Sequence, residues 1–146
     1  MASTYATIRS SIKPLTPEQL NAFLSEDRNA VLATINKNGT PQCTPVAFYW
    51  DGAAFYISFN KEAVKYKNLK RDPRMTLTVA DDDLKTFRAV IAKGQARIEE
   101  QDIWEMTGKI IEKGFGPEAS AVLEEIKQEN RVLLILKPKQ LQSWGR

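Results

Sequence analysis

Two pairs of turn residues constrain the fold of this chain more than any other feature. Asn38-Gly39 and Asp51-Gly52 each stand between segments of β-forming residues, and Asn-Gly and Asp-Gly are pairs that tight β-hairpins prefer. Apolar residues alternate before the first pair, and aromatic residues enrich the segment after the second. The sequence therefore predicts three consecutive antiparallel strands, connected as a meander, over residues 29–36, 40–50 and 53–59.

The second of these segments is interrupted by prolines. Pro41 and Pro45 cannot donate ladder hydrogen bonds, so we expect parts of this strand to lie at a sheet edge or a bulge, with backbone groups left for a ligand. Cys43 is the only cysteine, which excludes an internal disulfide and a cysteine cluster for zinc or iron–sulfur. Its extended, apolar surroundings predict a buried structural thiol.

Further strands and short helices follow along the chain. Thr16-Pro17-Glu18-Gln19 predicts a helix that begins with a capping box. We expect strands over 75–79, 87–98 (with a bulge or bend at Gly94) and 131–136, and helices over 62–71, 102–113 and 118–128. This pattern predicts a mainly β (α+β) fold: a six-stranded antiparallel barrel with short peripheral helices. Closing the barrel removes exposed strand edges, and pairing with a second copy is the alternative.

The composition excludes several classes of protein. The 146 residues show no linker, repeat or low-complexity tract, so we expect one domain over 1–146, with 1–15 as an N-terminal arm. The chain begins without a secretory signal pattern and has no window suited to a membrane span, which predicts a cytoplasmic protein. Histidine is absent, which excludes Ser-His-Asp and Cys-His catalysis. Asp81-Asp82-Asp83 predicts a charged turn rather than a metal site.

A basic segment is the strongest indication of a ligand. Residues 61–74 contain six lysines and arginines, although the whole chain carries a formal charge of only +3. On a helix, Lys67 falls on a solvent-facing sector, whereas Lys61 and Lys65 project from the first turns. Cations there become favourable when a phosphate binds the free N–H groups of the helix start. Lys61 and Lys65 are therefore the candidates for ligand contact, and the alternative is a solvated, lysine-rich helix face.

The chain as a whole resembles the pyridoxamine-phosphate-oxidase-like split β-barrels, an FMN-binding superfamily that also contains oxidoreductases using a deazaflavin coenzyme. The block Val64–Arg74, which reads VKYKNLKRDPR, is the most specific part of the resemblance. The other matching blocks, in the family's order, are residues 30–34, 39–48, 89–96 and 131–138.

The resemblance implies an FMN or deazaflavin cofactor in a groove between the subunits of a homodimer. The cofactor ring would lie along the strand Thr44-Pro45-Val46 and its phosphate near Lys65. Lys67 is a second phosphate candidate by family position, and Ser58 is a candidate hydroxyl donor to the same phosphate. Trp144 would cover the ring or pack against the barrel.

The implied function is an oxidoreductase that transfers hydride or electrons between the bound cofactor and a small organic substrate. No side chain is assigned as catalytic, since Tyr49 and Tyr56 are interpreted as barrel residues. The chain lacks the histidine and arginine pairing of authentic pyridoxamine-phosphate oxidases near its C-terminal end, so we do not expect that activity. The alternatives are a non-catalytic flavin-binding or carrier protein and a nucleic-acid-binding module that uses residues 61–74.

Overall fold

The computed structural model describes residues 3–146, so the first two residues of the predicted arm lie outside it. Its helices are α1 Thr4–Ser11, α2 Pro17–Ser25, α3 Val64–Arg71, α4 Trp104–Phe115 and α5 Ala119–Ile126, with a 3-10 turn at Gly116–Glu118. Its strands are β1 Ala30–Ile35, β2 Pro41–Val46, β3 Tyr49–Trp50, β4 Phe55–Asn60, β5 Arg74–Ala80, β6 Ala89–Gln95, β7 Arg97–Glu99, β8 Arg131–Leu136 and β9 Gln140–Trp144.

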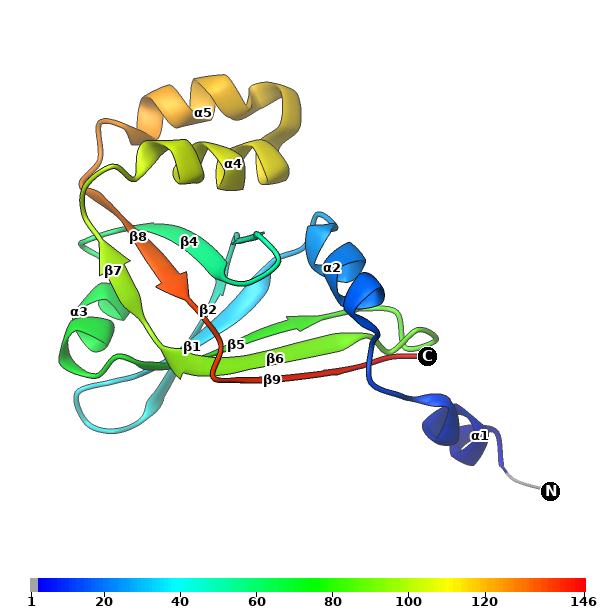
Figure 1. Cartoon of the computed structure of the whole chain (residues 1–146). Coiled ribbons are helices and arrows are strands. Elements are labelled where there is room, and N and C mark those ends of the chain that lie inside the picture. The colour runs from blue at the N-terminus through cyan, green and yellow to red at the C-terminus, as the bar shows by residue number, and fades with distance from the viewer. Residues whose placement is uncertain (1–2) are drawn as a thin grey trace.

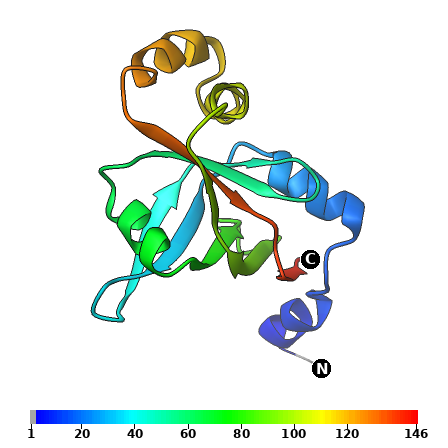
Figure 2. The same cartoon turned by 60° about the vertical axis from the view of Figure 1, so that its left-hand side comes forward.

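The strands form two antiparallel sheets. The five-stranded sheet has the order β2-β1-β5-β6-β9 and the four-stranded sheet the order β3-β4-β8-β7. The mainly β, antiparallel architecture with peripheral helices is confirmed (Figures 1 and 2). The chain is divided into nine strands rather than six, because two of the predicted strands pass from one sheet to the other and the C-terminal residues add a further strand.

Both predicted hairpin turns are confirmed, but the three-stranded meander is wrong. Gly39 and Gly52 adopt φ values of +85° and +97°, which glycine tolerates best. The first turn joins the paired strands β1 and β2, and the second joins the paired strands β3 and β4. The segment 40–50 is divided, because β2 belongs to the five-stranded sheet and β3 to the other. The segment 87–98 is divided in the same way, after β6.

Gly94, the predicted bulge or bend, is a position of close approach. A Cβ atom there would lie 2.9 Å from Leu136 Cδ1 and 3.3 Å from the carbonyl oxygen of Lys137. The chain changes sheets two residues later, at Ala96, whose N–H donates to the carbonyl oxygen of Pro73. A glycine is therefore required beside the bend rather than at it.

The core fills the space between the two sheets. Leu32 and Leu77 of the five-stranded sheet and Phe55, Ile57 and Leu134 of the four-stranded sheet are fully buried in one cluster. Helix α2 packs beside β3 and adds buried Phe23 and Leu24, and its predicted capping box is confirmed. The outer side of the four-stranded sheet packs against α4, where Leu133 and Ile135 meet Ile110 (Figure 1). Strand β8 is thus covered on both faces, which explains its continuous apolar run.

Two features at the ends of the chain were not predicted. Helix α1 lies within the predicted arm, buries none of its residues and projects from the barrel (Figure 1). Strand β9 pairs with β6 at the edge of the five-stranded sheet. None of its five residues is fully buried at this edge. Its sequence QLQSW therefore lacks the pattern of apolar residues by which a strand is predicted.

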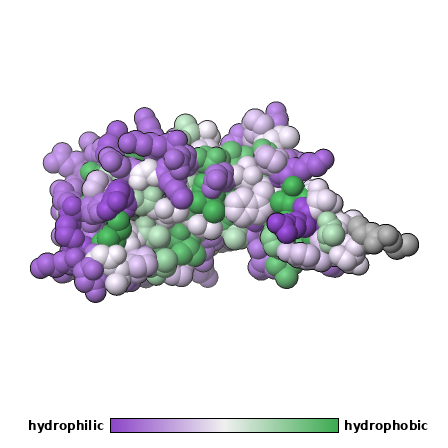
Figure 3. Space-filling model, turned by 90° about the horizontal axis from the view of Figure 1, so that it is seen from below, coloured by the Kyte–Doolittle hydropathy of each residue, from purple (hydrophilic) through white to green (hydrophobic). Residues whose placement is uncertain are grey.

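Cys43 is exposed, so the prediction of a buried thiol is wrong. Alternation along β2 turns Cys43, with Pro41 and Pro45, to the outer face of the five-stranded sheet, while Val46 points into the core. The outer face also carries Val31, which is 43% exposed in the middle of the sheet. Figure 3 views the molecule from below and shows hydrophobic residues reaching the surface between hydrophilic ones.

Asp81 anchors the turn between β5 and β6 through two arginines and a threonine. Its side chain is only 2% exposed, and it accepts hydrogen bonds from Arg88 Nε at 3.0 Å and from the Thr86 hydroxyl. Arg28 Nη2 lies 3.3 Å from its other oxygen. The Thr86 hydrogen bond, with the arginines, holds the pKa of Asp81 well below its usual range.

We expect Asp81→Asn to lower the free energy of unfolding by about 3 kcal/mol at pH 7, because it removes the buried carboxylate that pairs with Arg28 and Arg88 and leaves these arginines with the more exposed Glu26. A carboxyl with a lowered pKa stabilises the fold above its unfolded-state pKa of about 4, and that contribution is lost as pH falls below this value. Urea denaturation at several pH values should therefore show the deficit shrinking in acid. Asp82→Asn, at a fully exposed neighbour, should change stability by less than about 0.5 kcal/mol. Equal effects of the two variants would contradict this account.

Candidate functional site

A pocket of about 480 Å³ lies where both sheets meet the helical hairpin α4–α5. Three kinds of surface line it. The first is the end of β2, with Pro45, Val46 and Ala47. The second is polar and consists of Ser58, Asn60, Lys65 and Arg131. The third is an apolar wall from α4 and α5, made of Ile110, Ile111, Phe115, Val122 and Ile126. The pocket thus combines a cationic end with an apolar side.

Lys65 occupies the first turn of α3, and its side chain is half-buried in the pocket. Its ammonium nitrogen lies 5.3 Å from the centre of the Phe59 ring. Burial lowers the pKa of Lys65, and the neighbouring Arg131 guanidinium lowers it further. No carboxylate of residues 3–146 forms an ion pair with Lys65. A half-buried cation beside a second cation favours an anionic ligand.

Arg131 is held in place from two sides. Glu129 Oε2 lies 2.8 Å from Nη1, while Nη2 donates to the carbonyl oxygen and the hydroxyl of Ser58, both at 3.2 Å. The antiparallel pairing of β4 with β8 sets Arg131 opposite Asn60, two residues from Ser58. The Ser58 hydroxyl accepts from Arg131, which leaves its own proton for a ligand.

The start of α3 supplies further donors. Ala63 is the N-cap residue and makes no side-chain capping hydrogen bond, and it lines the same pocket. The Tyr66 N–H donates to the carbonyl oxygen of Ala63, but the earlier N–H groups of a helix have no partner within the helix, and they attract phosphate groups. Lys65, Arg131, Ser58 and this helix start therefore fit a phosphate group in both charge and hydrogen-bonding capacity.

The structure brings together four of the eight residues that the sequence suggested. Pro45, Val46, Ser58 and Lys65 line the pocket. Thr44 is adjacent in β2 but pairs with Leu32 and does not line it.

Lys61, Lys67 and Trp144 lie outside this pocket. Helix α3 begins at Val64, so Lys61 precedes the helix, and its ammonium lies 3.0 Å from Glu100 Oε1. Lys67 is exposed on α3. Trp144 lies on β9 opposite Ala89, where it lines a separate pocket with Pro14 and Leu141.

Arg131 and the α4–α5 wall are the site residues that sequence reasoning missed. Arg131 stands 73 residues after Ser58, and as the first residue of an apolar strand it resembles any strand-end cation. Strand pairing was the signal that could have found Arg131. If β8 is expected to pair antiparallel with β4, its first residue must lie beside the last residues of β4.

The basic segment does not form one continuous charged surface. Arg74 forms an ion pair with Asp72 at 2.8 Å. Lys61 forms an ion pair with Glu100 at 3.0 Å. Arg71 donates to the carbonyl oxygen of Ile35. Nucleic-acid binding usually requires a broad basic stripe, so this arrangement disfavours that alternative.

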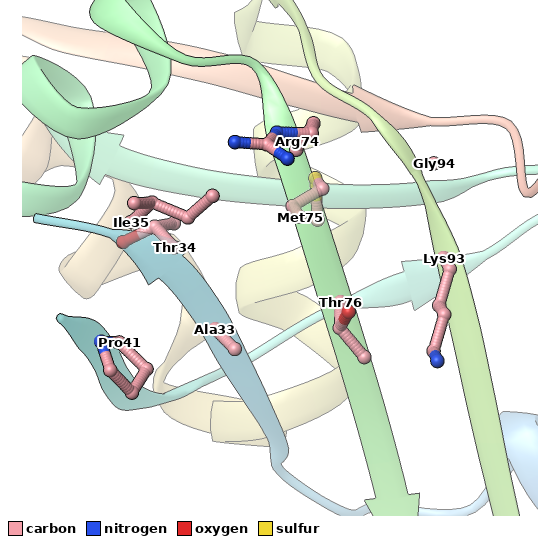
Figure 4. A pocket seen from close by; sticks show the side chains of 9 residues that line it. All are labelled: Ala33, Thr34, Ile35, Pro41, Arg74, Met75, Thr76, Lys93 and Gly94. Carbon is pink, nitrogen blue, oxygen red and sulfur yellow. The ribbon is translucent and has the colours of Figure 1, made fainter. Parts of the chain in front are cut away.

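A second pocket, of about 360 Å³, lies on the outer face of the five-stranded sheet (Figure 4). Ala33, Ile35 and Met75 contribute to its apolar lining, with Arg74 and Lys93 beside them. It shares no residue with the pocket at Lys65. We interpret it as part of the same outer face that carries Val31 and Cys43.

Comparison with known proteins places this fold. The family model for pyridoxamine 5'-phosphate oxidase matches residues 16–145. A conserved hypothetical protein from Mycobacterium tuberculosis has a similar structure, with a TM-score of 0.78, 24% identity, and coverage of 94% of this chain and 88% of that one. An F420 reductase has a TM-score of 0.67 and 24% identity, with coverage of 83% of this chain and 94% of that one. A FAD-binding protein from Mesorhizobium loti has a TM-score of 0.67 and 16% identity, with coverage of 92% of this chain and 96% of that one.

These structural similarities, all below 25% identity, show a shared fold. The family match extends over most of the sequence and includes the strands and the helix that build the pocket. Among residues 3–146, no helix is both long and apolar enough to cross a membrane. The chain belongs to the pyridoxamine 5'-phosphate oxidase family and has its split-barrel fold.

Proposed function

We propose that the protein is a homodimeric oxidoreductase that binds FMN or a deazaflavin coenzyme and acts on a small organic molecule. The observation that carries the proposal is the half-buried Lys65, placed with Arg131 and Ser58 at a helix start without a side-chain cap. F420 is a deazaflavin, and an F420 reductase and a FAD-binding protein share the fold, which supports this class of cofactor. Family membership alone does not imply oxidation of pyridoxamine phosphate, and we still expect that activity to be absent.

Each part of the pocket has a proposed role. Lys65, Arg131, Ser58 and the N–H groups of α3 would hold the phosphate, and Thr44, Pro45 and Val46 would support the ring. The bound cofactor supplies the hydride or electron transfer. The apolar wall of α4 and α5 would exclude water from one side of the cofactor. Lys61 and Lys67 remain secondary phosphate candidates, since they lie outside the pocket in one chain.

The outer face of the five-stranded sheet supports the proposed dimer. Val31 is exposed on its interior strand β1, and Cys43 and Pro45 are exposed on the neighbouring strand β2. Pro45 also lines the Lys65 pocket, so a second copy covering this face would border the cofactor. Trp144 lines a separate pocket in its own chain, so its predicted place over the ring requires that it come from the second copy.

The first test is a titration of the purified protein with FMN and, separately, with the deazaflavin coenzyme, followed by visible absorbance. Mass spectrometry should identify any chromophore that is released from the protein. We expect saturable binding of one cofactor and then its oxidation or reduction in the presence of small organic substrates. Binding without turnover in a broad substrate screen would favour a carrier, and binding of neither cofactor would refute the proposed function.

A further inference from the structure

A buried amide connects α3 to the end of β1. Asn68 is 3% exposed, and its Nδ2 donates to Thr34 Oγ1 and to Asn36 Oδ1, both at 3.0 Å. Thr34 is also buried, on β1. A buried amide that lost these partners would leave unsatisfied polar groups in the core. The hydrogen bonds therefore favour one position of the helix over small displacements.

Arg71 completes this network. Its Nη2 donates to Asn68 Oδ1 at 2.8 Å and to the carbonyl oxygen of Ile35 at 2.9 Å. Both donors and the acceptor of the Asn68 amide are thus engaged, and two residues of α3 are bound to three consecutive residues of the chain, 34–36. A leucine would fill the same space without specifying direction, because apolar packing is not directional.

The network lies one helical turn from the phosphate end of the pocket. Asn68 follows Lys65 by three residues, so both belong to one short, rigid helix. A shift or rotation of α3 at Asn68 would move Lys65 and the helix start together. Charge-assisted hydrogen bonds to a phosphate require donors within a few tenths of an ångström of their optimal distance.

We propose that Asn68 is a positioning residue for phosphate recognition: through Thr34, Asn36 and Arg71 it sets where Lys65 and the start of α3 meet the phosphate. This inference rests on the proposed function, because it presumes that a phosphate binds at Lys65. Asn68 itself does not line the pocket and acts only through the helix.

The test compares FMN with riboflavin, which lacks the phosphate, in wild type and in Asn68→Ala. We expect the FMN affinity to fall about tenfold and the riboflavin affinity to change less than about twofold, so that the preference for FMN falls about tenfold. If the deazaflavin coenzyme is the cofactor, it and its phosphate-free deazariboflavin core replace this pair. Thr34→Val removes one acceptor with little change in volume and should show the same effect at a smaller size.

Asp81→Asn is the matched control, because it disturbs a polar network at the opposite end of β5 from α3. It should reduce stability without changing the preference for the phosphate-bearing cofactor. An unchanged preference in Asn68→Ala, or an equal loss of both affinities, would overturn the positioning role. If Asn68→Ala does not fold, Thr34→Val decides by the same criterion. If wild type shows no preference for the phosphate-bearing cofactor, the proposed phosphate site itself fails.

Discussion

Lys65→Ala should lower the affinity for FMN, or for the deazaflavin coenzyme, by about 30-fold while the protein remains folded. Lys65 is the one cation of α3 that lines the pocket, and its ammonium group is half-buried without a carboxylate partner among residues 3–146. A hydrogen bond to a charged group contributes about 2 kcal/mol, which corresponds to this change in affinity. Isothermal titration calorimetry of both proteins measures the difference directly.

Lys70→Ala is the matched control for this variant. Lys70 has the same charge and lies on the same helix, but it is exposed and does not line the pocket. Its removal should change the affinity by less than about twofold, because exposed charges are screened by solvent and salt. Equal losses in the two variants would show that the general charge of α3, and not a phosphate contact, governs binding.

The pH dependence provides a second readout for Lys65. Burial and Arg131 lower the pKa of Lys65 below the usual lysine value, and only the protonated amine attracts a phosphate. Above about pH 7 a phosphate monoester is already doubly charged, so the charge of the phosphate itself no longer changes with pH. Affinity should therefore fall as pH rises through the lowered pKa, and Lys65→Ala should lack this step. A step of the same size in the variant would exclude Lys65 as its source.

Val31→Asp should convert the protein from a dimer to a monomer and weaken cofactor binding by about tenfold or more. Val31 is 43% exposed on β1, an interior strand of the five-stranded sheet, between Pro45 of β2 and Thr78 of β5. A carboxylate in a dimer interface there would be buried without a partner in each copy, at a cost of several kcal/mol. Light scattering after size exclusion should give the 16.5 kDa of one chain for the variant and twice that mass for wild type.

Leu84→Asp is the control for the added charge. Leu84 is an even more exposed apolar residue, at 72%, but it lies in the turn between β5 and β6. This variant should remain dimeric and bind the cofactor as wild type does. A monomeric wild type at micromolar concentration would refute the proposed dimer. A dimeric Val31→Asp protein with normal cofactor binding would show that another surface forms the interface.

Local features of the sequence predicted local structure correctly. The turns at Asn38-Gly39 and Asp51-Gly52 and the capping box of α2 depend on residues within a few positions of one another. Lys65 is similarly local, since its place in the first turn of α3 follows from the helix in which it lies. Such interactions form in the same way whatever the rest of the chain does.

The tertiary structure decided what depends on distant residues. It assigned β2 and β3 to different sheets, turned Cys43 outward, and placed Arg131 against Ser58 across 73 residues of sequence. It also formed β9, whose polar sequence becomes a strand only because β6 offers a free edge. The sequence by itself therefore determined the turns, the capping box of α2 and the cation at Lys65. The pairing of strands decided which side chains join Lys65 in one pocket, because hydrogen bonds between strands and burial in a shared core act between residues that are remote along the chain.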